Sequence, residues 1–380
     1  NVLQKFIPLY FDKKNNESIK NVDNNKLSKL NYKYKIPDKF SSVIKDGDKT
    51  YTIKLINGKC KNFKDQNLEI TNIDSYDSKF FFNNKLANTN DFLIDLNSLF
   101  LNSGVKIIIN KNKNVEIKIS NIVLDDNLTI FQKNLIICEE GSKINFIEKY
   151  ENQNSSIHNV YNIFEIRKKS ILNQIVIQNT SKNHELYLSS YASCMENSNF
   201  DQKIYNFSDG YVRNYHYSDL LQENSKVSHI GFFFINSNNI ADNKTYVSHL
   251  AKSCQSNQIY KGVLGEKSKA NYFSNTYVDK IAQKTEGYQL SKGILLSEDS
   301  SYFSKPELRI FADDVKCSHG STSGSIDENS LHYLMTRGLS REISMKLLIK
   351  GFLNDIIEYI KNPSIKEFVE TKLEEQINGY

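Results

Sequence analysis

The stretch ADDVKCSHGSTSG, residues 312–324, places Cys317 and His319 one residue apart, just after the acidic pair Asp313–Asp314. A Cys sulfur and a neutral His nitrogen are common ligands of iron and zinc, and the same two residue types can act together as nucleophile and base. Two side chains are too few to complete a metal site. A metal bound here would therefore need further ligands from another turn of the chain or from another protein.

The alternation of apolar and polar residues indicates that both side chains lie on one face of a strand. At ~3.3 Å per residue, residues two positions apart are about 6–7 Å apart and point to the same side. The alternation changes phase within the acidic pair, which predicts a bend at Asp313–Asp314, because Asp is a common turn residue. The residues that share a face are Leu308, Ile310 and Ala312 before the bend, and Val315, Cys317 and His319 after it.

Other interpretations of this stretch need no metal. An isolated Cys in a strand is most often a small buried apolar residue, and a His beside it is usually a hydrogen-bonded structural residue. A Cys–His nucleophile pair would also need an orienting Asn and an oxyanion turn, and the stretch supplies neither. The Asp pair with His319–Gly320 is typical of β-helix enzymes that cleave polysaccharides, but adjacent Asp residues in a strand face opposite ways. The motif GxxxxGK[ST] does not occur, so we do not expect the chain to hydrolyse ATP itself.

Composition disfavours several classes of protein. The chain has 380 residues, of which 39% are apolar and 24% charged, as expected for a globular protein with one large or two ordinary domains. The net charge is +5, but no basic run is dense enough for a nucleic-acid-binding stripe, so we expect no nucleic-acid partner. No stretch reaches transmembrane length and the first residues hold no secretory apolar core, so we expect no membrane partner. Five widely spaced Cys residues argue against a disulfide framework and favour a reducing compartment.

The pattern of apolar residues changes along the chain. Residues 1–90 are polar and weakly patterned, and only YTIKLINGKC (51–60) clearly predicts a strand, which runs into a turn at Asn57–Gly58. From about residue 91 to 320, apolar residues recur at every second position, which predicts many half-buried strands. A sandwich, a propeller and a parallel β-helix all fit this pattern. The scarcity of hairpin dipeptides weakly disfavours the antiparallel folds.

The end of the chain changes to helical spacing. Asp327 can cap a helix over ENSLHYLMTR that Gly338 ends, and Ser340 can cap a longer helix. The sequence SIKE predicts a capping box, in which Ser364 caps a last helix and Glu367 lies three residues on. The predicted apolar stripes are Ile343, Leu347, Phe352, Ile356 and Ile360 in the longer helix, and Phe368, Val369 and Leu373 in the last one.

Longer segments of the chain resemble a known family. The segment PELRIFADDVKCSHGSTSGSIDENSLHYLMTRGLS (306–340) is similar to the characteristic segment of the SufD branch of the SufB/SufD family, which belongs to the SUF iron–sulfur cluster assembly system. SufB proteins typically carry a Glu-His-Glu-Ala run at this corner, so CSHG and the length of the chain favour SufD. The other matching segments are NKTYVSHLAKSCQSNQIYKGVL (243–264), AQKTEGYQLSKGILLS (282–297) and, more loosely, VRNYHYSDLLQ (212–222) and LINGK (55–59).

The resemblance implies a mainly β protein: a right-handed parallel β-helix flanked by N-terminal and C-terminal helical regions. It would divide the chain into a partly helical N-terminal region (1–90), a parallel β-helix core (91–324) and a C-terminal helical domain (325–380). In such a fold we expect the alternating apolar residues to point into a continuous apolar interior. The residues expected there are Ile107, Ile117, Ile130, Ile137, Ile175 and Ile177.

The resemblance also implies a function as a non-catalytic scaffold subunit, and not as an enzyme, with a role in iron acquisition. Such chains pair with a SufB-like paralogue through their β-helices, and each partner binds a SufC-like ATPase through its C-terminal helices. By this likeness His319 and Cys317 are candidate ligands of iron or a nascent cluster at the SufB interface, and no cofactor is expected to stay bound to this chain alone. The compartment would be a bacterial cytoplasm or a plastid stroma.

The resemblance places the contact with SufC in the segment YLMTRGLS. Between two capped helices, an Arg beside a Gly offers a cationic donor and a close backbone approach. The chain departs from the family at His332, where an aromatic residue is usual. Two alternatives stay open: the paralogous SufB subunit, which should hold a cluster on its own, and, more distantly, a β-helix enzyme acting on polysaccharide. The candidate docking residues are Tyr333, Leu334, Arg337 and Gly338.

Overall fold

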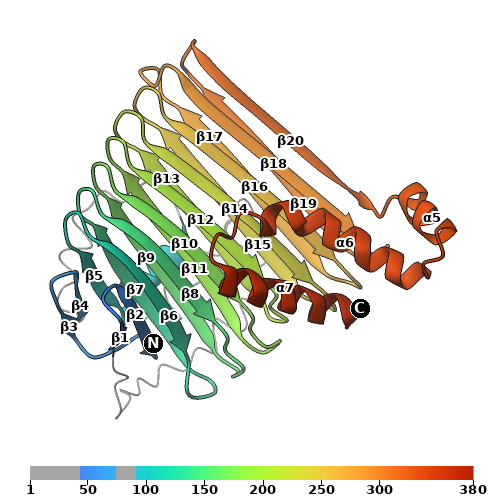
Figure 1. The fold of residues 1–380 in the computed structure, drawn as a ribbon, viewed down its shortest axis with the longest axis horizontal. Coiled ribbons are helices and arrows are strands. Elements are labelled where there is room, and N and C mark those ends of the chain that lie inside the picture. Colours follow the sequence, from blue (N-terminus) through green and yellow to red (C-terminus); the bar gives the residue numbers. More distant parts are fainter. Residues whose placement is uncertain (1–42, 74–90, 380) are drawn as a thin grey trace.

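The computed structural model describes residues 43–73 and 91–379, and its body is built from two facing β-sheets of ten strands each (Figure 1). Sheet A contains, in spatial order, β1 (Val43–Asp46), β2 (Thr50–Ile56), β6 (Asn114–Ile122), β8 (Lys143–Tyr150), β10 (Ile171–Gln178), β12 (Asn199–Asn206), β14 (Lys226–Ile235), β16 (Gln255–Leu264), β18 (Thr285–Leu295) and β20 (Val315–Ser325). Sheet B contains β3 (Phe63–Lys64), β4 (Leu68–Asn72), β5 (Val105–Ile109), β7 (Thr129–Cys138), β9 (Ile157–Ile166), β11 (Glu185–Cys194), β13 (Val212–Leu220), β15 (Ile240–His249), β17 (Lys269–Val278) and β19 (Ser301–Ile310).

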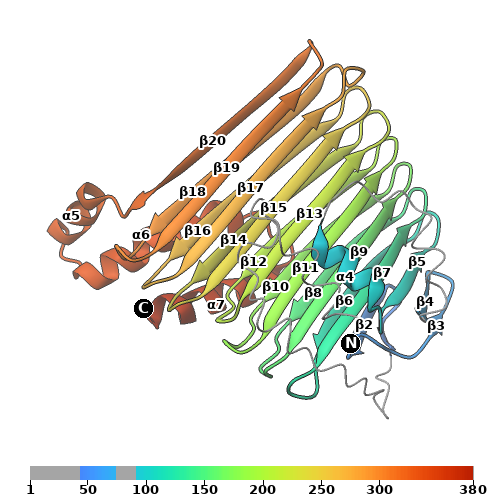
Figure 2. The ribbon, with the colours of Figure 1, turned by 180° about the vertical axis from the view of Figure 1, so that it is seen from behind.

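The two sheets together form a parallel β-solenoid. From β5 onward, each strand pairs in parallel with the strand two places along the chain, as β6 does with β8 and β18 with β20. Successive strands therefore alternate between the sheets, and each turn of the chain adds one strand to each sheet (Figures 1 and 2). The expected parallel β-helix is confirmed, whereas a sandwich or a propeller would not give this pairing. Among the described strands, only β1–β2, β3–β4 and β4–β5 pair antiparallel.

The strand predicted at residues 51–60 is present and belongs to the solenoid. It forms β2, which pairs in parallel with β6 inside sheet A. The predicted turn follows it, with Asn57 and Gly58 at φ values of 48° and 78°. A Cβ on Gly58 would lie 2.3 Å from Oγ of Ser103, so the turn needs glycine at this position.

The N-terminal region expected to be partly helical is described only in part. Residues 1–42 and 74–90 lie outside the described residues, and residues 43–73 form strands rather than helices. Both sheets thus begin before residue 91. The division of the chain into 1–90, 91–324 and 325–380 stays a prediction.

Three of the six apolar residues expected inside the solenoid lie on its outer faces instead. Ile107 and Ile117 lie in the interior, and Ile130 is buried on the inward side of β7. Ile137, by contrast, packs outside sheet B against α4 (Phe92–Leu99). Ile175 and Ile177 pack outside sheet A, under the C-terminal helices. Alternation identifies the residues that share a face of a strand, but it cannot say which face is inward when both faces are covered.

The interior is not continuously apolar, because a hydrogen-bonded polar network runs through its middle. The Glu148 carboxylate accepts hydrogen bonds from Nε2 of Gln174 at 2.5 Å and from Nδ2 of Asn162 at 3.2 Å. Gln202 donates to Oε1 of Gln174 at 2.9 Å, and its own Oε1 lies 2.8 Å from Nδ1 of His229. Side-chain amides in successive turns lie next to one another, so each can form a hydrogen bond with the next. Because their hydrogen bonds are formed, these polar groups can be buried at little cost.

Three helices follow the solenoid, and two of their three predicted caps are confirmed. They are α5 (Glu328–Thr336), α6 (Arg341–Ile357) and α7 (Pro363–Asn378), and the first two are capped by Asp327 and Ser340 as expected. Gly338, at φ 92°, ends the first. The predicted cap of α7 is wrong: Oδ1 of Asn362 accepts from the Ile365 amide at 3.3 Å, and Pro363 takes the first helical position. Proline suits that position because its missing N–H would have no helical partner there.

Helices α6 and α7 lie on the outer face of sheet A (Figure 1), and this contact corrects the predicted apolar stripe of α6. Ile356 is fully buried, as expected, but Ile343 and Leu347 are 49% and 46% exposed. The buried stripe of α6 instead runs through Ile349, Leu353, Ile356 and Ile357. Ile343 and Leu347 lie on a different face of α6 from this stripe, which accounts for their exposure.

Polar side-chain contacts hold α6 against sheet A and α4 against sheet B. Nζ of Lys261, on β16, donates to the Phe352 carbonyl at 2.5 Å and to the Asp355 carboxylate at 2.6 Å, both on α6. On the other sheet, Nη2 of Arg213 donates to both carboxylate oxygens of Asp91 at 2.8 Å. Asp91 also caps α4, so one buried ion pair fixes the start of that helix against sheet B.

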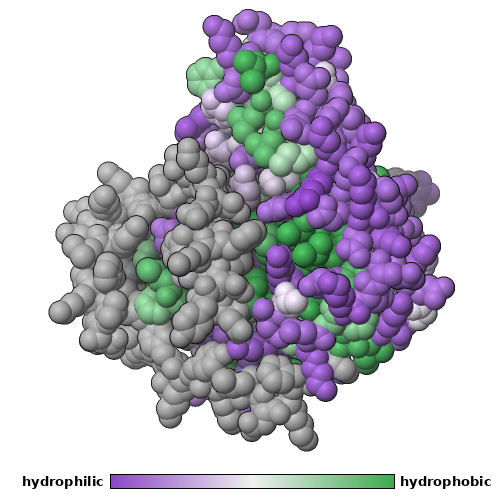
Figure 3. All heavy atoms as spheres, turned by 90° about the vertical axis from the view of Figure 1, so that its left-hand side faces the viewer, coloured by the Kyte–Doolittle hydropathy of each residue, from purple (hydrophilic) through white to green (hydrophobic). Residues whose placement is uncertain are grey.

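The described surface is mainly polar. On the side of the molecule that carries the N-terminal strands, hydrophilic residues enclose smaller hydrophobic areas (Figure 3). None of the helices in residues 43–73 and 91–379 combines the length and apolarity that a membrane crossing requires.

Five buried histidines predict that mild acid destabilises the fold. Burial lowers the pKa of His158 and His229 to about 3 and that of His184 and His249 to about 4, and it holds the pKa of His216 well below its usual range. Each imidazole is neutral when folded but takes up a proton in the unfolded chain below about pH 6.5. Its contribution to stability is therefore complete above that pH and is lost as the pH falls toward the folded pKa. The free energy of unfolding in urea should fall by several kcal/mol, at up to about 2 kcal/mol per histidine, from pH 7 to 5.

Glu148 has the opposite effect on how the free energy of unfolding changes with pH. Burial raises its pKa to about 7, so its contribution to stability is present below about pH 4.5 and is lost as the pH rises through 7. One carboxyl opposes five imidazoles, so the net effect of acid is destabilising. Glu148→Gln should steepen the loss of stability between pH 7 and 5 because it removes the opposing group. An unfolding free energy that stays level or rises toward pH 5 would contradict this account.

Candidate functional site

The solenoid ends in two strands with open edges. β20 is the last strand of sheet A and pairs only with β18, and β19 is the last strand of sheet B and pairs only with β17. All residues of both strands are exposed or half-buried, whereas β16 and β18 each bury five or more residues. Figure 1 shows this end in orange, at the far end of the body from the N-terminal strands. An edge strand presents a row of backbone groups that can pair with another chain.

Strand register places Cys317 and His319 on the same side of β20, as predicted. Cys317 lies opposite Gly287 and His319 opposite Gln289, and both partners are buried residues of β18 on its inward face. The two candidate ligands thus occupy the inward face of the last strand, where no further turn of the described chain covers them.

The two side chains differ in their surroundings. Cys317 is half-buried against Val278, Ala282 and Ala312, and burial raises the pKa of its thiol. A Cβ on Gly287 would lie 3.3 Å from its sulfur, so this glycine leaves the room that the thiol fills. His319 is exposed. Cys317 therefore contributes to packing, whereas the imidazole is free to meet a partner.

The acidic pair before β20 forms the predicted bend. The Asp314 carbonyl accepts from the Lys284 amide at 2.6 Å, and the Asp314 amide donates to Oε1 of Gln283 at 2.9 Å. Asp313 and Asp314 are both exposed at this corner between β19 and β20. The bend accounts for the pair without assigning it any chemistry.

Metal binding at this end would need more ligands than Cys317 and His319. In residues 43–73 and 91–379, no three His, Cys, Asp or Glu side chains are grouped so that they could hold a metal ion. The other four cysteines are buried inside the solenoid, and burial raises the pKa of each thiol. Cys317 and His319 can thus supply part of a coordination sphere that another protein completes.

The four residues expected to dock an ATPase lie together in α5 and the turn that follows it. Tyr333, Arg337 and Gly338 are exposed, and Leu334 is half-buried. The Arg337 guanidinium lies over the Tyr333 ring at 5.3 Å from its centre. α5 stands clear of the solenoid at its C-terminal end (Figures 1 and 2).

Helix packing leaves exposed two residues that were predicted to lie on the apolar stripe of α6. Ile343 and Leu347 lie on the part of α6 that follows α5, and Met335 of α5 is also exposed. Together with Tyr333 they form the α5–α6 apolar surface. Their spacing predicted a helix correctly. Only the packing of α6 shows that Ile343 and Leu347 lie on its exposed face.

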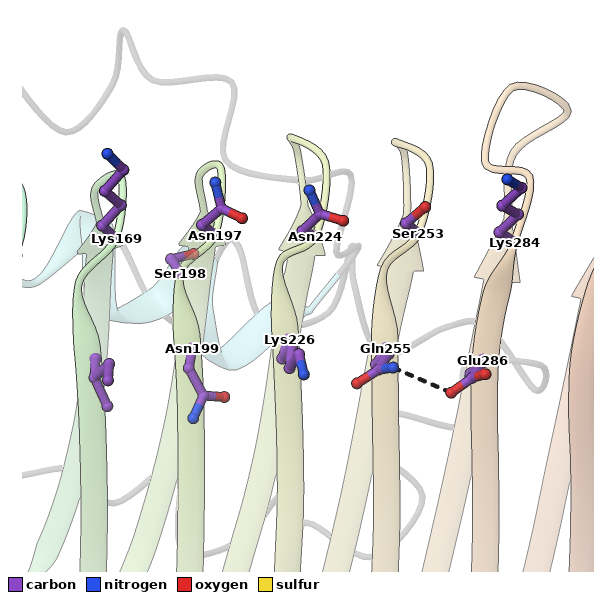
Figure 4. A pocket seen from close by; sticks show the side chains of 11 residues that line it. Lys169, Asn197, Ser198, Asn199, Asn224, Lys226, Ser253, Gln255, Lys284 and Glu286 are labelled. Atoms are coloured by element: carbon purple, nitrogen blue, oxygen red, sulfur yellow. Dashed lines mark hydrogen bonds between the residues drawn. The ribbon is translucent and has the colours of Figure 1, made fainter.

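A shallow trough crosses the turns of sheet A, and it bears on the alternative of a polysaccharide-acting enzyme. It has a volume of about 710 Å³, and five turn residues project along its rim (Figure 4). Its one lining carboxylate, Glu286, accepts a hydrogen bond from Nε2 of Gln255 at 3.1 Å. Glycoside hydrolysis commonly uses two facing carboxylates, so the trough does not supply that pair. The rim residues are Lys169, Asn197, Asn224, Ser253 and Lys284.

Comparison with known proteins identifies relatives of this solenoid. Residues 121–352, more than half of the chain, match the family described as SUF system FeS cluster assembly, SufBD core domain. The iron–sulfur cluster assembly protein SufD of Escherichia coli (strain K12) is 27% identical over 142 residues, which cover 37% of this chain and 34% of SufD. An iron–sulfur cluster assembly SufBD family protein of Staphylococcus epidermidis is 23% identical over 296 residues, 77% of this chain and 63% of the relative. The chain thus spans about a third of the first relative and just under two thirds of the second.

The burial of the cysteines predicts selective labelling. Cys317 is half-buried and the other four cysteines are buried, so a maleimide should modify one thiol per folded chain, and slowly, because the pKa of Cys317 is raised. Intact-mass and peptide mass spectrometry would identify the modified residue, with Cys317→Ser as the control that abolishes labelling. Equal labelling of Cys60 or Cys254 in the folded chain would contradict the structure.

Proposed function

The chain belongs to the SufBD family of the SUF iron–sulfur cluster assembly system, and we propose that it acts there as a non-catalytic, SufD-type scaffold subunit. The observation that carries this proposal is the open end of the solenoid, where β19 and β20 leave their outer edges unpaired among the described strands. Cys317 and His319 lie at the same end. An exposed sheet edge beside potential metal ligands suits a subunit that assembles cargo together with a partner.

The partner in this proposal is a SufB-like paralogue that joins its own solenoid to this end. Unpaired backbone groups of an edge strand find full hydrogen bonding only when another strand is added. The side chains around the end support burial in a contact, since Phe303 of β19 and Phe311 just beyond it are both more than half exposed. Aromatic residues of this kind are enriched at the centres of protein interfaces.

The cargo would be iron or a nascent iron–sulfur cluster, bound only while both chains are together. His319 offers an exposed imidazole nitrogen, a good ligand for iron, and the partner would supply the remaining ligands. Cys317 would contribute less, because its thiol is half-buried and its raised pKa disfavours the thiolate that binds metal. A site shared between chains can open when the chains move apart, which would allow the cargo to leave. A role in iron acquisition would follow from the same site.

The α5–α6 apolar surface is the proposed contact with a SufC-like ATPase. Tyr333, Met335, Ile343 and Leu347 expose apolar area on two helices that stand at the end of the molecule. Arg337, Gly338 and the half-buried Leu334 lie in the same helix and turn and would add a cationic donor and a close backbone approach. A solvent-exposed apolar cluster with a charged edge is typical of protein–protein contacts.

The same features weigh on the alternatives. A SufB-type subunit would hold a cluster by itself, but the described residues offer two clustered ligands at most. The polysaccharide-acting enzyme would need paired carboxylates, and the trough on sheet A has one. Five free cysteines suit a reducing compartment, for which we propose a bacterial cytoplasm or a plastid stroma.

His319→Ala should lower cluster assembly while leaving the complex intact. The exposed imidazole makes no contact that holds the fold, so the variant should co-purify normally with a SufB-like chain. Iron and sulfide in the complex should fall severalfold, whereas Cys317→Ala should cost less. His332→Ala is the matched control, because His332 is also exposed but lies on α5. If His319→Ala keeps full iron and sulfide content, the proposed ligand role fails.

Ile343→Asp combined with Leu347→Asp should abolish binding of a SufC-like ATPase. Both residues are about half exposed, so the charges should be tolerated by the fold but not by an apolar contact. The measurement is a pull-down of the ATPase encoded in the same genome, with pairing to the SufB-like chain as the internal reference. Tyr359→Asp, at the exposed residue near the other end of α6, is the matched control. Unchanged ATPase capture by the double variant would rule out this surface.

A further inference from the structure

A second cavity lies on the outer face of sheet B, on the opposite side of the molecule from α6 and α7. It has a volume of about 280 Å³ and is lined by residues of β13, β15, β17 and β19. In Figure 2, this sheet faces the viewer, and α4 packs on it over β7 and β9. In the described part of the chain, no helix covers β15 to β19 on this side.

Aromatic and cationic side chains alternate across the cavity. Tyr215, Lys244, Phe273 and Lys305 lie opposite one another in register on four neighbouring strands. Neighbouring strands are about 4.8 Å apart, so each ring is flanked by a Lys within the width of a small ligand. Tyr246, two residues after Lys244 on β15, adds another ring to the lining. Its ring centre lies 6.2 Å from that of Tyr217 on β13.

The cavity carries an excess of positive charge. Its lining holds Lys244, Lys305 and Arg309 against a single carboxylate, Glu307. Nε of Arg309 donates to that carboxylate at 2.6 Å, and this bond lowers the pKa of Glu307. Lys305 is exposed and has no ion pair within 4 Å in residues 43–73 and 91–379. Lys305 is thus a cation of this lining that is available to an anion.

A buried polar atom in the lining has no partner. Asn275 is only 8% exposed, and its Oδ1 accepts no hydrogen bond in the described structure. Such an acceptor is costly to leave unsatisfied, whereas a ligand that donates a hydrogen bond there removes the cost. Asn275 belongs to the lining of the same cavity as the rings and the cations, and its Oδ1 is buried just beneath that lining.

We propose that this cavity binds a small ligand that joins a phosphate group to a planar aromatic ring, of the mononucleotide class. The ring would stack on Phe273 or Tyr246, and the phosphate would lie near Lys305. With a small rotation of the Asn275 side chain, an amino or hydroxyl group of the ligand would donate to its Oδ1. Aromatic stacking and charge-assisted hydrogen bonds are among the stronger contacts that a protein makes with a nucleotide. A cavity of this volume, at the lower limit for ligand sites, suits one nucleotide and not a longer strand.

Isothermal titration of the full chain with AMP tests this proposal. AMP should bind saturably with one site per chain, while adenosine and inorganic phosphate should each bind at least about tenfold more weakly, because each offers half of the contacts. Lys305→Ala should weaken AMP binding by about tenfold and Lys305→Arg should restore it. Lys269→Ala is the matched control, because Lys269 is exposed on the same face of β17, four residues from Phe273 and outside the cavity.

Three results would overturn the proposal. The first is the absence of saturable AMP binding at millimolar concentration. The second is equal weakening by Lys269→Ala and Lys305→Ala, which would indicate general attraction to a basic surface. The third is tighter binding of a single-stranded oligonucleotide that spans many nucleotides per chain, which would assign the surface to nucleic acid instead.

Discussion

Backbone pairing between successive turns is the constraint on which the rest of this structure depends. Every strand from β6 to β18 is hydrogen-bonded to a neighbour on each side, so the body satisfies its backbone groups internally. At the last strands of the two sheets, the backbone groups on the outer edge have no neighbouring strand to bond to in the described chain. In the described chain, β19 and β20 each have one paired edge and one open edge. The end of the solenoid is therefore the place where a second chain can add the most favourable contacts, and Cys317 and His319 lie on it.

The pairing between successive turns also explains which features of the fold the alternating sequence pattern could predict. Alternation, the bend at Asp313–Asp314 and the caps of α5 and α6 are local properties, and all of them were predicted correctly. The inward face was not predictable where both faces are covered: every residue of β7 is buried, although Ile136 points inward and Ile137 outward. The polar interior was missed for a related reason. Glu148 and its amide neighbours resemble solvent-facing residues until successive turns bring them together.

Tertiary packing also separates histidines that look alike in the sequence. Of the seven, five are buried in hydrogen bonds inside the solenoid, and His319 and His332 are exposed. The closeness of Cys317 and His319 in the sequence drew attention to what is an edge strand, but it could not show that the thiol packs and the imidazole does not. The exposure of Ile343 and Leu347 was hidden in the same way, because helical spacing does not reveal which face of the helix packs against the rest of the protein.

The central claim is that the open end of the solenoid pairs with a second β-solenoid. Hydrogen–deuterium exchange of this chain, alone and with the SufB-like chain of the same genome, tests it most directly. The account predicts that amides of β20 and β19 exchange quickly in the free chain and become protected in the complex, while those of β1 to β10 do not change. Complex formation that leaves β19 and β20 unprotected, with new protection elsewhere, would contradict it.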